Sequence, residues 1–375
     1  MQAARQIDKL DYMQVPMKTR KRDRLRAPLP RTDGGATMTA IVQDHYSSEP
    51  EGLFGLTEID RPAIGEDEVL VRVHAASVDR GTWHIMSGLP YPIRLAGFGL
   101  RRPKYANPGR NLAGTVEAVG TGVTGFAPGD EVYGTCNGSF AEYAALTLDK
   151  LGAKPANLTY EQAAAVPISA VTALQGLRDR GRVQPGHKVL IVGASGGVGT
   201  FAVQIAKALG AQVTGVCSTS KVDLVRSLGA DHVIDYTAGD TDGKKRYDVI
   251  LDTGGHRSLR RLRGTLTRTG TLVIVGSETD GRWLGGFGRT IRAMLLSPFI
   301  SQKLTPLASS ENATDLIAVT GLVESGQVTP VVDRTYPLEE AAAAIRHMLD
   351  GKARGKVVVS VSPGHSQTPA PGSTP

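Results

Sequence analysis

Cysteine and tryptophan are scarce in this 375-residue chain: each occurs twice, and aromatic residues make up only 5% of the composition. Two cysteines, Cys136 and Cys217, cannot build a disulfide framework or a cysteine-rich zinc lobe. No run approaches the roughly 18 apolar residues of a membrane-spanning helix, and no charged and apolar leader precedes a small-residue cleavage site. We therefore expect a cytoplasmic protein without an integral membrane segment.

Excess positive charge is concentrated at one end of the chain. The net charge is +7, and residues 1–37 carry +5 of it through nine basic and four acidic residues. A nearly neutral remainder argues against nucleic acid as a partner. We expect residues 1–37 to form a disordered basic arm, or to precede a true start at Met38. The four acids disfavour a transit peptide.

The pattern of apolar, polar and turn-forming residues changes along the rest of the chain. From residue 38 to 160, short alternating stretches are separated by Gly, Pro and Asp, which predicts antiparallel strands in a small barrel or sandwich. Residues 161–305 alternate apolar strands with helices, which predicts a parallel, doubly wound α/β sheet. Residues 306–361 add two helices and two strands, and the Pro- and Ser-rich residues 362–375 are expected to be a disordered tail.

One segment in the second region has two interpretations. The stretch RTIRAMLLSPF, residues 289–299, mixes arginine with large apolar residues. Helices that lie on membrane surfaces have this composition, but so do ordinary packed helices. We favour the packed helix.

The stretch VLIVGASGGVGTFAVQ, from Val189 to Gln204, places four glycines within seven residues. Ala194, Gly196 and Gly199 form an A-x-G-x-x-G turn between an apolar strand and a helix, the context in which this motif binds a dinucleotide. Missing side chains let a pyrophosphate approach the backbone, and the helix start offers free N–H groups and a partial positive charge. The turn therefore predicts the phosphate cradle of a nicotinamide cofactor.

The strand that follows this helix ends in CSTSK, which bears on the choice of cofactor. An Asp or Glu about 20 residues after the glycines binds the ribose 2′-OH of NAD, but this chain has Ser218, Thr219, Ser220 and Lys221 there. Hydroxyls and an ammonium attract a 2′-phosphate, which favours NADP(H). The alternative is that Lys221 is a solvated side chain at the start of the next helix.

Together with PGRNLAGTVEAVG, PGDEVYG, GSFAEY and GKVVVSV, the glycine turn resembles the zinc-independent NADPH:quinone oxidoreductase-like branch of the medium-chain dehydrogenase/reductase superfamily. The resemblance runs from about Met38 to Val361. It implies a Rossmann domain, residues 161–305, inserted into a GroES-like, mostly antiparallel β-barrel catalytic domain made of residues 38–160 and the return 306–361. It also implies NADP(H), a small quinone or enone substrate, and a homodimer formed at the sheet edge near TLVIVGSE.

The resemblance also assigns cofactor-binding residues by position. Some would cradle the diphosphate, some would bind the 2′-phosphate, and others would line the nicotinamide half, although glycines at strand ends occur in any doubly wound sheet. Along the chain they are Thr172, Ala194, Ser195, Gly196, Gly197, Val198, Gly199, Ser218, Lys221, Tyr236, Thr253, Gly254, Gly276, Ser277 and Lys356.

Zinc ligands are missing where the zinc alcohol dehydrogenases have them. Catalytic zinc needs about three converging Cys, His, Asp or Glu side chains. The Gly-His-Glu of those enzymes falls on Pro108 to Asn111 here, and their closely spaced cysteine cluster is absent. We read Cys136 as a small buried residue rather than a ligand, and expect no metal.

The chain departs from the family pattern in residues that would face nicotinamide and substrate. Relatives have Asn-Pro-x-Asp where this chain has Asp79-Arg80-Gly81-Thr82, and the Asp of PGxDxAG is Asn111 here. His84 stands where relatives often have Tyr, and it is our candidate catalytic proton donor. The alternative is that His84 is a packed or hydrogen-bonded wall residue beside Trp83.

We therefore predict an oxidoreductase that transfers hydride from NADPH to a quinone or to an activated C=C bond. One alternative is zinc-independent oxidation of an alcohol with NADP+. A second, from another class, is an NADPH-binding sensor or interaction protein with little turnover, in which the basic arm helps to bind a partner.

Overall fold

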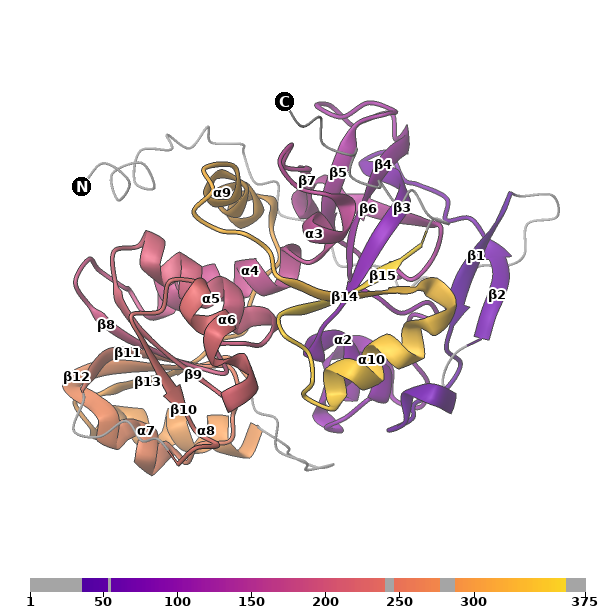
Figure 1. Ribbon diagram of the computed structural model, residues 1–375. Helices are drawn as coiled ribbons and strands as arrows, with labels where there is room; N and C mark the ends of the chain where they lie inside the picture. The colour runs from indigo at the N-terminus through magenta and orange to yellow at the C-terminus, as the bar shows by residue number, and fades with distance from the viewer. Residues whose placement is uncertain (1–35, 53–54, 240–245, 277–286, 362–375) are drawn as a thin grey trace.

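The computed structural model describes residues 36–52, 55–239, 246–276 and 287–361, and these form two lobes (Figure 1). The catalytic lobe contains the N-terminal strands together with the last strands of the chain. The cofactor lobe is the α/β part between them. The basic arm and the tail predicted for the two ends lie outside the described residues, apart from the first residues of β1, and stay predictions.

The catalytic lobe is built on a two-stranded and a seven-stranded sheet. The small sheet pairs β1 (Thr37–Val42) with β2 (Gly55–Asp60). The large sheet has the order β14-β15-β3-β4-β5-β7, with β6 also paired to β3. Its strands are β3 (Glu68–Val78), β4 (Asn111–Val119), β5 (Glu131–Thr135), β6 (Tyr143–Thr147), β7 (Leu151–Ala153), β14 (Val332–Pro337) and β15 (Lys356–Ser360).

Both ends of the chain contribute to the large sheet because β15 pairs antiparallel with β3. In Figure 1 the yellow β14 and β15 accordingly lie among the purple N-terminal strands. Period-two burial explains β3: Val69, Val71 and Val73 are buried, whereas Arg72 between them is exposed. The helices of this lobe are η1 (Pro50–Gly52), α2 (Arg80–Ser87), η2 (Arg94–Phe98), η3 (Leu148–Lys150), α3 (Tyr160–Ala164), α9 (Ala313–Glu324), η7 (Leu338–Glu340) and α10 (Ala341–Leu349).

The cofactor lobe contains a parallel six-stranded sheet of order β10-β9-β8-β11-β12-β13. Its strands are β8 (Lys188–Val192), β9 (Gln212–Cys217), β10 (His232–Asp235), β11 (Tyr247–Asp252), β12 (Leu266–Ile274) and β13 (Lys303–Pro306). Its helices are α4 (Pro167–Leu174), η4 (Gln175–Arg180), α5 (Gly197–Ala208), η5 (Thr219–Lys221), α6 (Val222–Ser227), α7 (Leu259–Thr265), α8 (Phe287–Leu296) and η6 (Ser297–Phe299). The order reverses between β8 and β11, where doubly wound sheets bind nucleotides.

This architecture confirms the predicted fold class, a doubly wound parallel sheet inserted into a mostly antiparallel domain. The sheet edge near TLVIVGSE is formed by β13, because β12 itself lies between β11 and β13, and the predicted dimer at this edge stays a prediction. Sequence reasoning did not identify β13, which forms that edge of the sheet. Helix α8 packs through the fully buried Ala293, while Met294 and Leu295 are exposed, so only one face of this predicted helix is packed.

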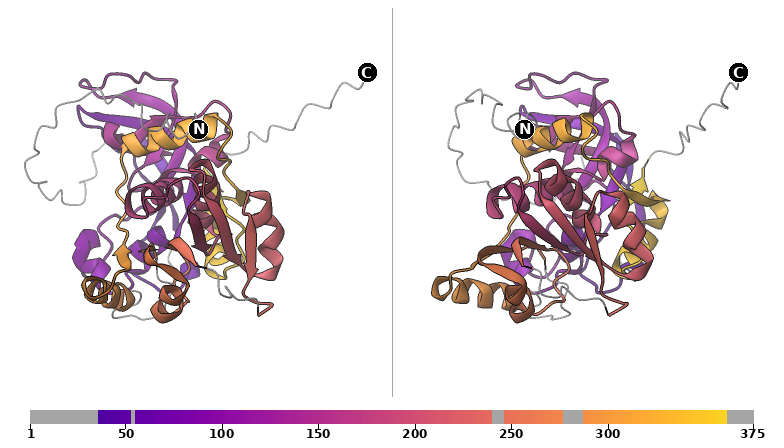
Figure 2. Two further views of the ribbon diagram at one scale, coloured as in Figure 1. Left: turned by 90° about the vertical axis from the view of Figure 1, so that its left-hand side faces the viewer. Right: turned by 60° about the vertical axis from the view of Figure 1, so that its left-hand side comes forward.

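Helix α9 connects the two lobes (Figure 2). On the catalytic side, the Tyr133 hydroxyl of β5 lies 2.7 Å from Thr320 Oγ1. On the other side, the carboxylate of Asp315 accepts hydrogen bonds from Gln175 (2.7 Å) and Arg178 (2.6 Å) of η4. Burial raises the pKa of Asp315, but hydrogen bonds from Asn312, Gln175 and Arg178 outweigh this and hold it below its ordinary value.

We expect both thiols to be unreactive in the folded protein. Cys136 and Cys217 are 7% and 2% exposed, and burial raises the pKa of Cys136 to about 12 and that of Cys217 to about 11. Because the thiolate is the reacting form, an aromatic disulfide reagent at about pH 8 should label neither residue until denaturant is added. Rapid labelling of the native protein at either position would contradict the burial described here.

Candidate cofactor and active site

The predicted cradle is a tight turn between β8 and α5. Gly193 has a φ of +81°, which favours glycine. A Cβ built on Gly199 would lie 2.0 Å from the Gly193 carbonyl oxygen, so the helix start packs directly on the turn. Gly196 begins α5 without a side-chain cap, whereas Asp79 caps α2. The first amides of α5 therefore have no intrahelical or capping partner, and they fit an anionic diphosphate.

Backbone contacts from both lobes hold this turn. The Ala194 N–H donates to the carbonyl of Val216 in β9 (3.0 Å), and the Ser195 carbonyl accepts from the N–H of Gly355 (2.9 Å), just before β15. The cradle is therefore positioned by the sheet behind it and by the returning end of the chain. The predicted residues from Ala194 to Gly199 lie together at this one place.

Lys356 lies beside the same helix start. Its side chain is 2% exposed, and a Cβ built on Gly197 would lie 3.0 Å from its Cδ. Nζ donates to the carbonyl of Val78 at the end of β3 (3.0 Å). Burial lowers the pKa of Lys356, and the nearby Asp79 carboxylate partly offsets this. A buried cation under an uncapped helix start strengthens the fit to an anionic group.

The predicted 2′-phosphate residues lie at the carboxyl ends of two paired strands. Ser218 and Lys221 follow β9, and Tyr236 follows β10, with its N–H bound to the Cys217 carbonyl. Lys221 Nζ donates to the carbonyls of Gly351 and Ala353, both at 2.7 Å. Lys221 stands at the start of α6, as the alternative interpretation has it, but its ammonium also binds the turn between α10 and β15.

The residues predicted for the nicotinamide half follow later strands. The Thr253 hydroxyl donates to the Val192 carbonyl (2.8 Å) and lies against Gly193, and Gly254 and Gly276 are at the same carboxyl edge of the sheet. Thr172 lies in α4, where its buried hydroxyl donates to Ser309 Oγ (3.1 Å). Ser277 lies outside the described residues.

Two departures from the family pattern contact each other. The amide of Asn111 donates to Asp79 Oδ2 (2.8 Å), and its Oδ1 accepts from the N–H of Ile168 (2.9 Å) at the start of α4. A carboxylate at position 111 could not donate. Relatives have Asn at the first position and Asp at the second, so carboxylate and amide have exchanged places. Sequence reasoning identified both changes but not the contact between Asp79 and Asn111. The exchange of an acid for an amide at one position and of an amide for an acid at the other was the signal for it.

His84 is half-buried in α2, and its ring is committed to the backbone. Nδ1 lies 2.9 Å from the carbonyl of Leu89. A carbonyl only accepts, so Nδ1 carries the proton, and a neutral ring then has no proton on Nε2. His84 can protonate a substrate only as an imidazolium. This geometry fits the alternative interpretation as a hydrogen-bonded wall residue.

Sequence reasoning missed an ion pair at the end of β11. Asp252 is fully buried, and its carboxylate accepts from the Gly255 N–H (3.0 Å) and from Arg289 in the first turn of α8. Within the part of the chain that the structure describes, Nε and Nη1 of Arg289 are buried without a hydrogen-bond partner. The sequence signal that could have identified this ion pair is an Asp at the end of an apolar strand, next to a loop that contains glycines.

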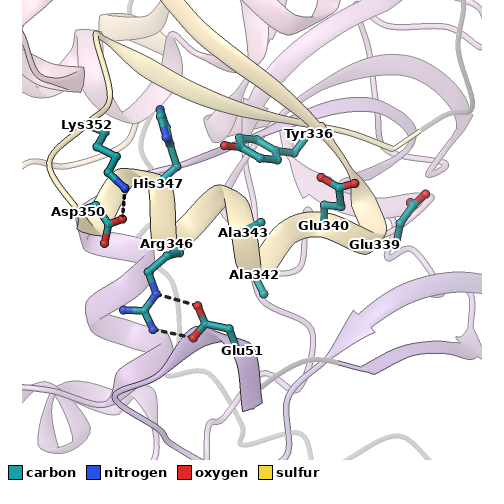
Figure 3. Close-up of a pocket in the computed structure, with 10 residues that line it drawn as sticks. All are labelled: Glu51, Tyr336, Glu339, Glu340, Ala342, Ala343, Arg346, His347, Asp350 and Lys352. Atoms are coloured by element: carbon teal, nitrogen blue, oxygen red, sulfur yellow. Dashed lines mark hydrogen bonds and ion pairs between the residues drawn. The ribbon is translucent and has the colours of Figure 1, made fainter.

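Two surface hollows lie outside this group of residues. The first, of about 550 Å³, lies on α10, where Arg346 forms two hydrogen bonds with Glu51 (2.7 and 2.6 Å; Figure 3). The second, of about 500 Å³, contains Arg260, Arg263 and Arg268. No predicted site residue lines either hollow. Among the described residues, no group of three or more His, Cys, Asp or Glu could hold a metal ion, and no helix is long and apolar enough to cross a membrane.

Two protein-family models match the chain: an alcohol dehydrogenase GroES-like domain over residues 65–175 and a zinc-binding dehydrogenase over residues 228–359. The mitochondrial NAD(P)H oxidoreductase RTN4IP1 of Bos taurus is 34% identical over 86% of this chain and 89% of its own length. The 2-methylene-furan-3-one reductase of Solanum lycopersicum is 31% identical over 80% of this chain and 74% of its own. The quinone oxidoreductase structure from Coxiella burnetii matches with a TM-score of 0.74 and 26% identity, over 87% of this chain and 100% of that one.

We expect Asn111→Asp to destabilise the protein, because it places two carboxylates within hydrogen-bond distance in a buried site. The loss should be on the order of 3 kcal/mol at neutral pH, and smaller in acid, where the two groups can share a proton. The double variant Asp79→Asn/Asn111→Asp should recover most of this loss. Urea unfolding of the three proteins measures it, and equal stability of both variants would contradict the pairing.

Proposed function

Because the chain belongs to the quinone oxidoreductase-like branch of the medium-chain dehydrogenase/reductase superfamily, we propose that it is a zinc-independent enzyme that uses NADPH to reduce a quinone or an activated C=C bond. The single observation that carries this proposal is the uncapped start of α5 with Lys356 beside it. The names of similar proteins, which include quinone oxidoreductase and 2-methylene-furan-3-one reductase, support the substrate class.

The chain's own residues would bind and orient the reactants. The amides of Gly197 to Gly199 and the ammonium of Lys356 would hold the diphosphate, and the loop after β11 would border the nicotinamide half. When bound, the nicotinamide supplies a hydride at C4. The link from Asp79 through Asn111 to Ile168 fixes the start of α2 against the cofactor lobe. The acceptor oxygen would take its proton from water or from the imidazolium of His84.

Particular residues of this chain support both zinc independence and the preference for NADPH. Position 110, where a zinc dehydrogenase has His, is Arg110, which pairs with Glu311 (2.5 Å). No acid stands at residues 218–221, and Lys221 and Ser218 supply groups that attract a 2′-phosphate. A homodimer and a cytoplasmic location stay predictions, and β13 is the strand edge we propose for the dimer.

We expect the purified protein to oxidise NADPH with quinones or enones as acceptors. Anaerobic stopped-flow absorbance against a panel of quinones, enones, enals and simple ketones measures this, and activity should survive dialysis against a chelator. Simple ketones and the reverse oxidation of alcohols with NADP+ serve as controls. Binding of NADPH without turnover of any acceptor would contradict the proposed activity, and loss of activity on chelation would contradict zinc independence.

We also expect NADPH to bind more tightly than NADH. Lys221→Met should weaken NADPH binding by about tenfold or more, since a charge-assisted contact is lost, and should leave NADH binding nearly unchanged. Fluorescence titration of both proteins with both cofactors measures the four affinities. Equal affinities of the unaltered protein for NADPH and NADH would contradict the role of Ser218 and Lys221.

A further inference from the structure

We propose that Arg289 binds the carbonyl oxygen of the hydride acceptor and that Asp252 holds Arg289 in position. This inference rests on the proposed function and identifies the group that would stabilise charge on the substrate. Neither residue belongs to the predicted site, and the glycine turn does not depend on them.

Both residues lie at the carboxyl edge of the parallel sheet, where doubly wound folds bind ligands. Asp252 is the last residue of β11. Helix α8 connects the end of β12 to the start of β13, so its first turn, which contains Arg289, returns from that same edge. One turn later, the fully buried Ala293 packs against the sheet, and this fixes the rotation of the helix.

Burial makes the free donors of Arg289 significant. Its side chain is 11% exposed, and among the described residues only Nη2 has a partner, the Asp252 carboxylate. Nε and Nη1 are buried and make no hydrogen bond to any residue that the structure describes. A guanidinium stays charged at any ordinary pH, and leaving its donors unpaired in the interior is unfavourable, so such groups call for a ligand or a water.

Asp252 is engaged on both oxygens and therefore acts as an anchor. Oδ1 accepts from the N–H of Gly255 (3.0 Å), and Oδ2 accepts from Arg289. The ion pair fixes the plane of the guanidinium, so the directions of its Nε–H and Nη1–H bonds are fixed as well. A buried N–H donor on a fixed cation suits an oxygen that carries negative charge.

The strand order indicates which oxygen this is. Residues for the 2′-phosphate follow β9 and β10, and the diphosphate cradle follows β8, all on one side of the reversal point. Asp252 ends β11, on the other side, next to Thr253 and Gly254 in the loop proposed for the nicotinamide half. The ligand of Arg289 therefore belongs to the reacting end rather than to the phosphates.

The chemistry of the proposed reaction creates such an oxygen. When an enone accepts a hydride at its β-carbon, the C=C electron pair shifts and the carbonyl oxygen becomes an enolate; a quinone likewise gains charge on oxygen. The acceptor is reduced by two electrons as NADPH is oxidised to NADP+, and water then protonates the product. A preorganised donor stabilises the developing charge. Arg289 would thus restrict substrates to C=C bonds conjugated with a carbonyl.

The test uses a paired substitution, because removing Arg289 alone would leave the Asp252 carboxylate buried and unpaired. The variant Asp252→Asn/Arg289→Met removes both charges, and Arg292→Met, at an exposed position of the same helix, is the matched control. We expect the paired variant to lose about 10²- to 10³-fold in kcat with an enone, while its Kd for NADPH stays within about twofold. Arg292→Met should match the unaltered enzyme.

A second readout does not need turnover. The probe is 4-nitrophenol, whose anion resembles an enolate oxygen and absorbs visible light, bound to the enzyme with NADP+. Arg289 should lower the pKa of the bound phenol, and the paired variant should lose this shift. If the unaltered enzyme reduces no acceptor but shows the shift, the proposed function fails and the role of Arg289 as an anion-binding residue stands.

Three results would overturn the inference. The first is full enone activity in the folded paired variant, which would make the ion pair purely structural. The second is a loss of activity matched by an equal loss of NADPH affinity, which would assign Arg289 to the cofactor. The third is an identical pKa of bound 4-nitrophenol in the unaltered and paired proteins.

Discussion

The hydrogen bond from the Gly355 N–H to the Ser195 carbonyl joins the two lobes at the cofactor turn. Gly355 has a φ of +94°, and a Cβ there would lie 2.5 Å from the Val331 carbonyl oxygen, so only glycine lets the chain pass this point. The next residue, Lys356, starts β15 and sends its ammonium to the end of β3. The cradle, the buried cation and the pairing of the two chain ends all depend on this crossing.

Two polar groups that lie between the lobes are each satisfied from more than one element, which makes the arrangement specific. Asn111 uses both ends of its amide, toward Asp79 and toward Ile168. Asp315 does the same between α9 and η4. Arg289, which lies within the cofactor lobe, differs, because its Nε and Nη1 have no partner among the described residues. Asn111 and Asp315 therefore hold the fold, whereas Arg289 keeps donors that a ligand could bind.

Local sequence signals predicted the regular parts of this molecule well. The alternation of β3 and the glycine turn of α5 are short-range patterns. They led to the correct sheet classes and to a turn with the predicted strand–turn–helix geometry. Strand β13 was missed because it is only four residues long. Helix α2 was missed because Asp79 was interpreted as a departure from the family pattern and not as the N-cap of a helix. Lys221, Asp252 and Arg289 acquire their partners through contacts between distant segments, which no local pattern contains.

Because β15 is the last strand of the chain, its position determines when the cofactor site can be completed during synthesis. Every strand of the cofactor sheet precedes residue 307 in the chain, so this sheet can pair before the last element exists. Its cradle nevertheless lacks Lys356 and the Gly355 contact until β15 has been made and has paired with β3. The complete cofactor site therefore forms only in a finished chain, and cofactor binding stabilises the two lobes together rather than the nascent α/β unit alone.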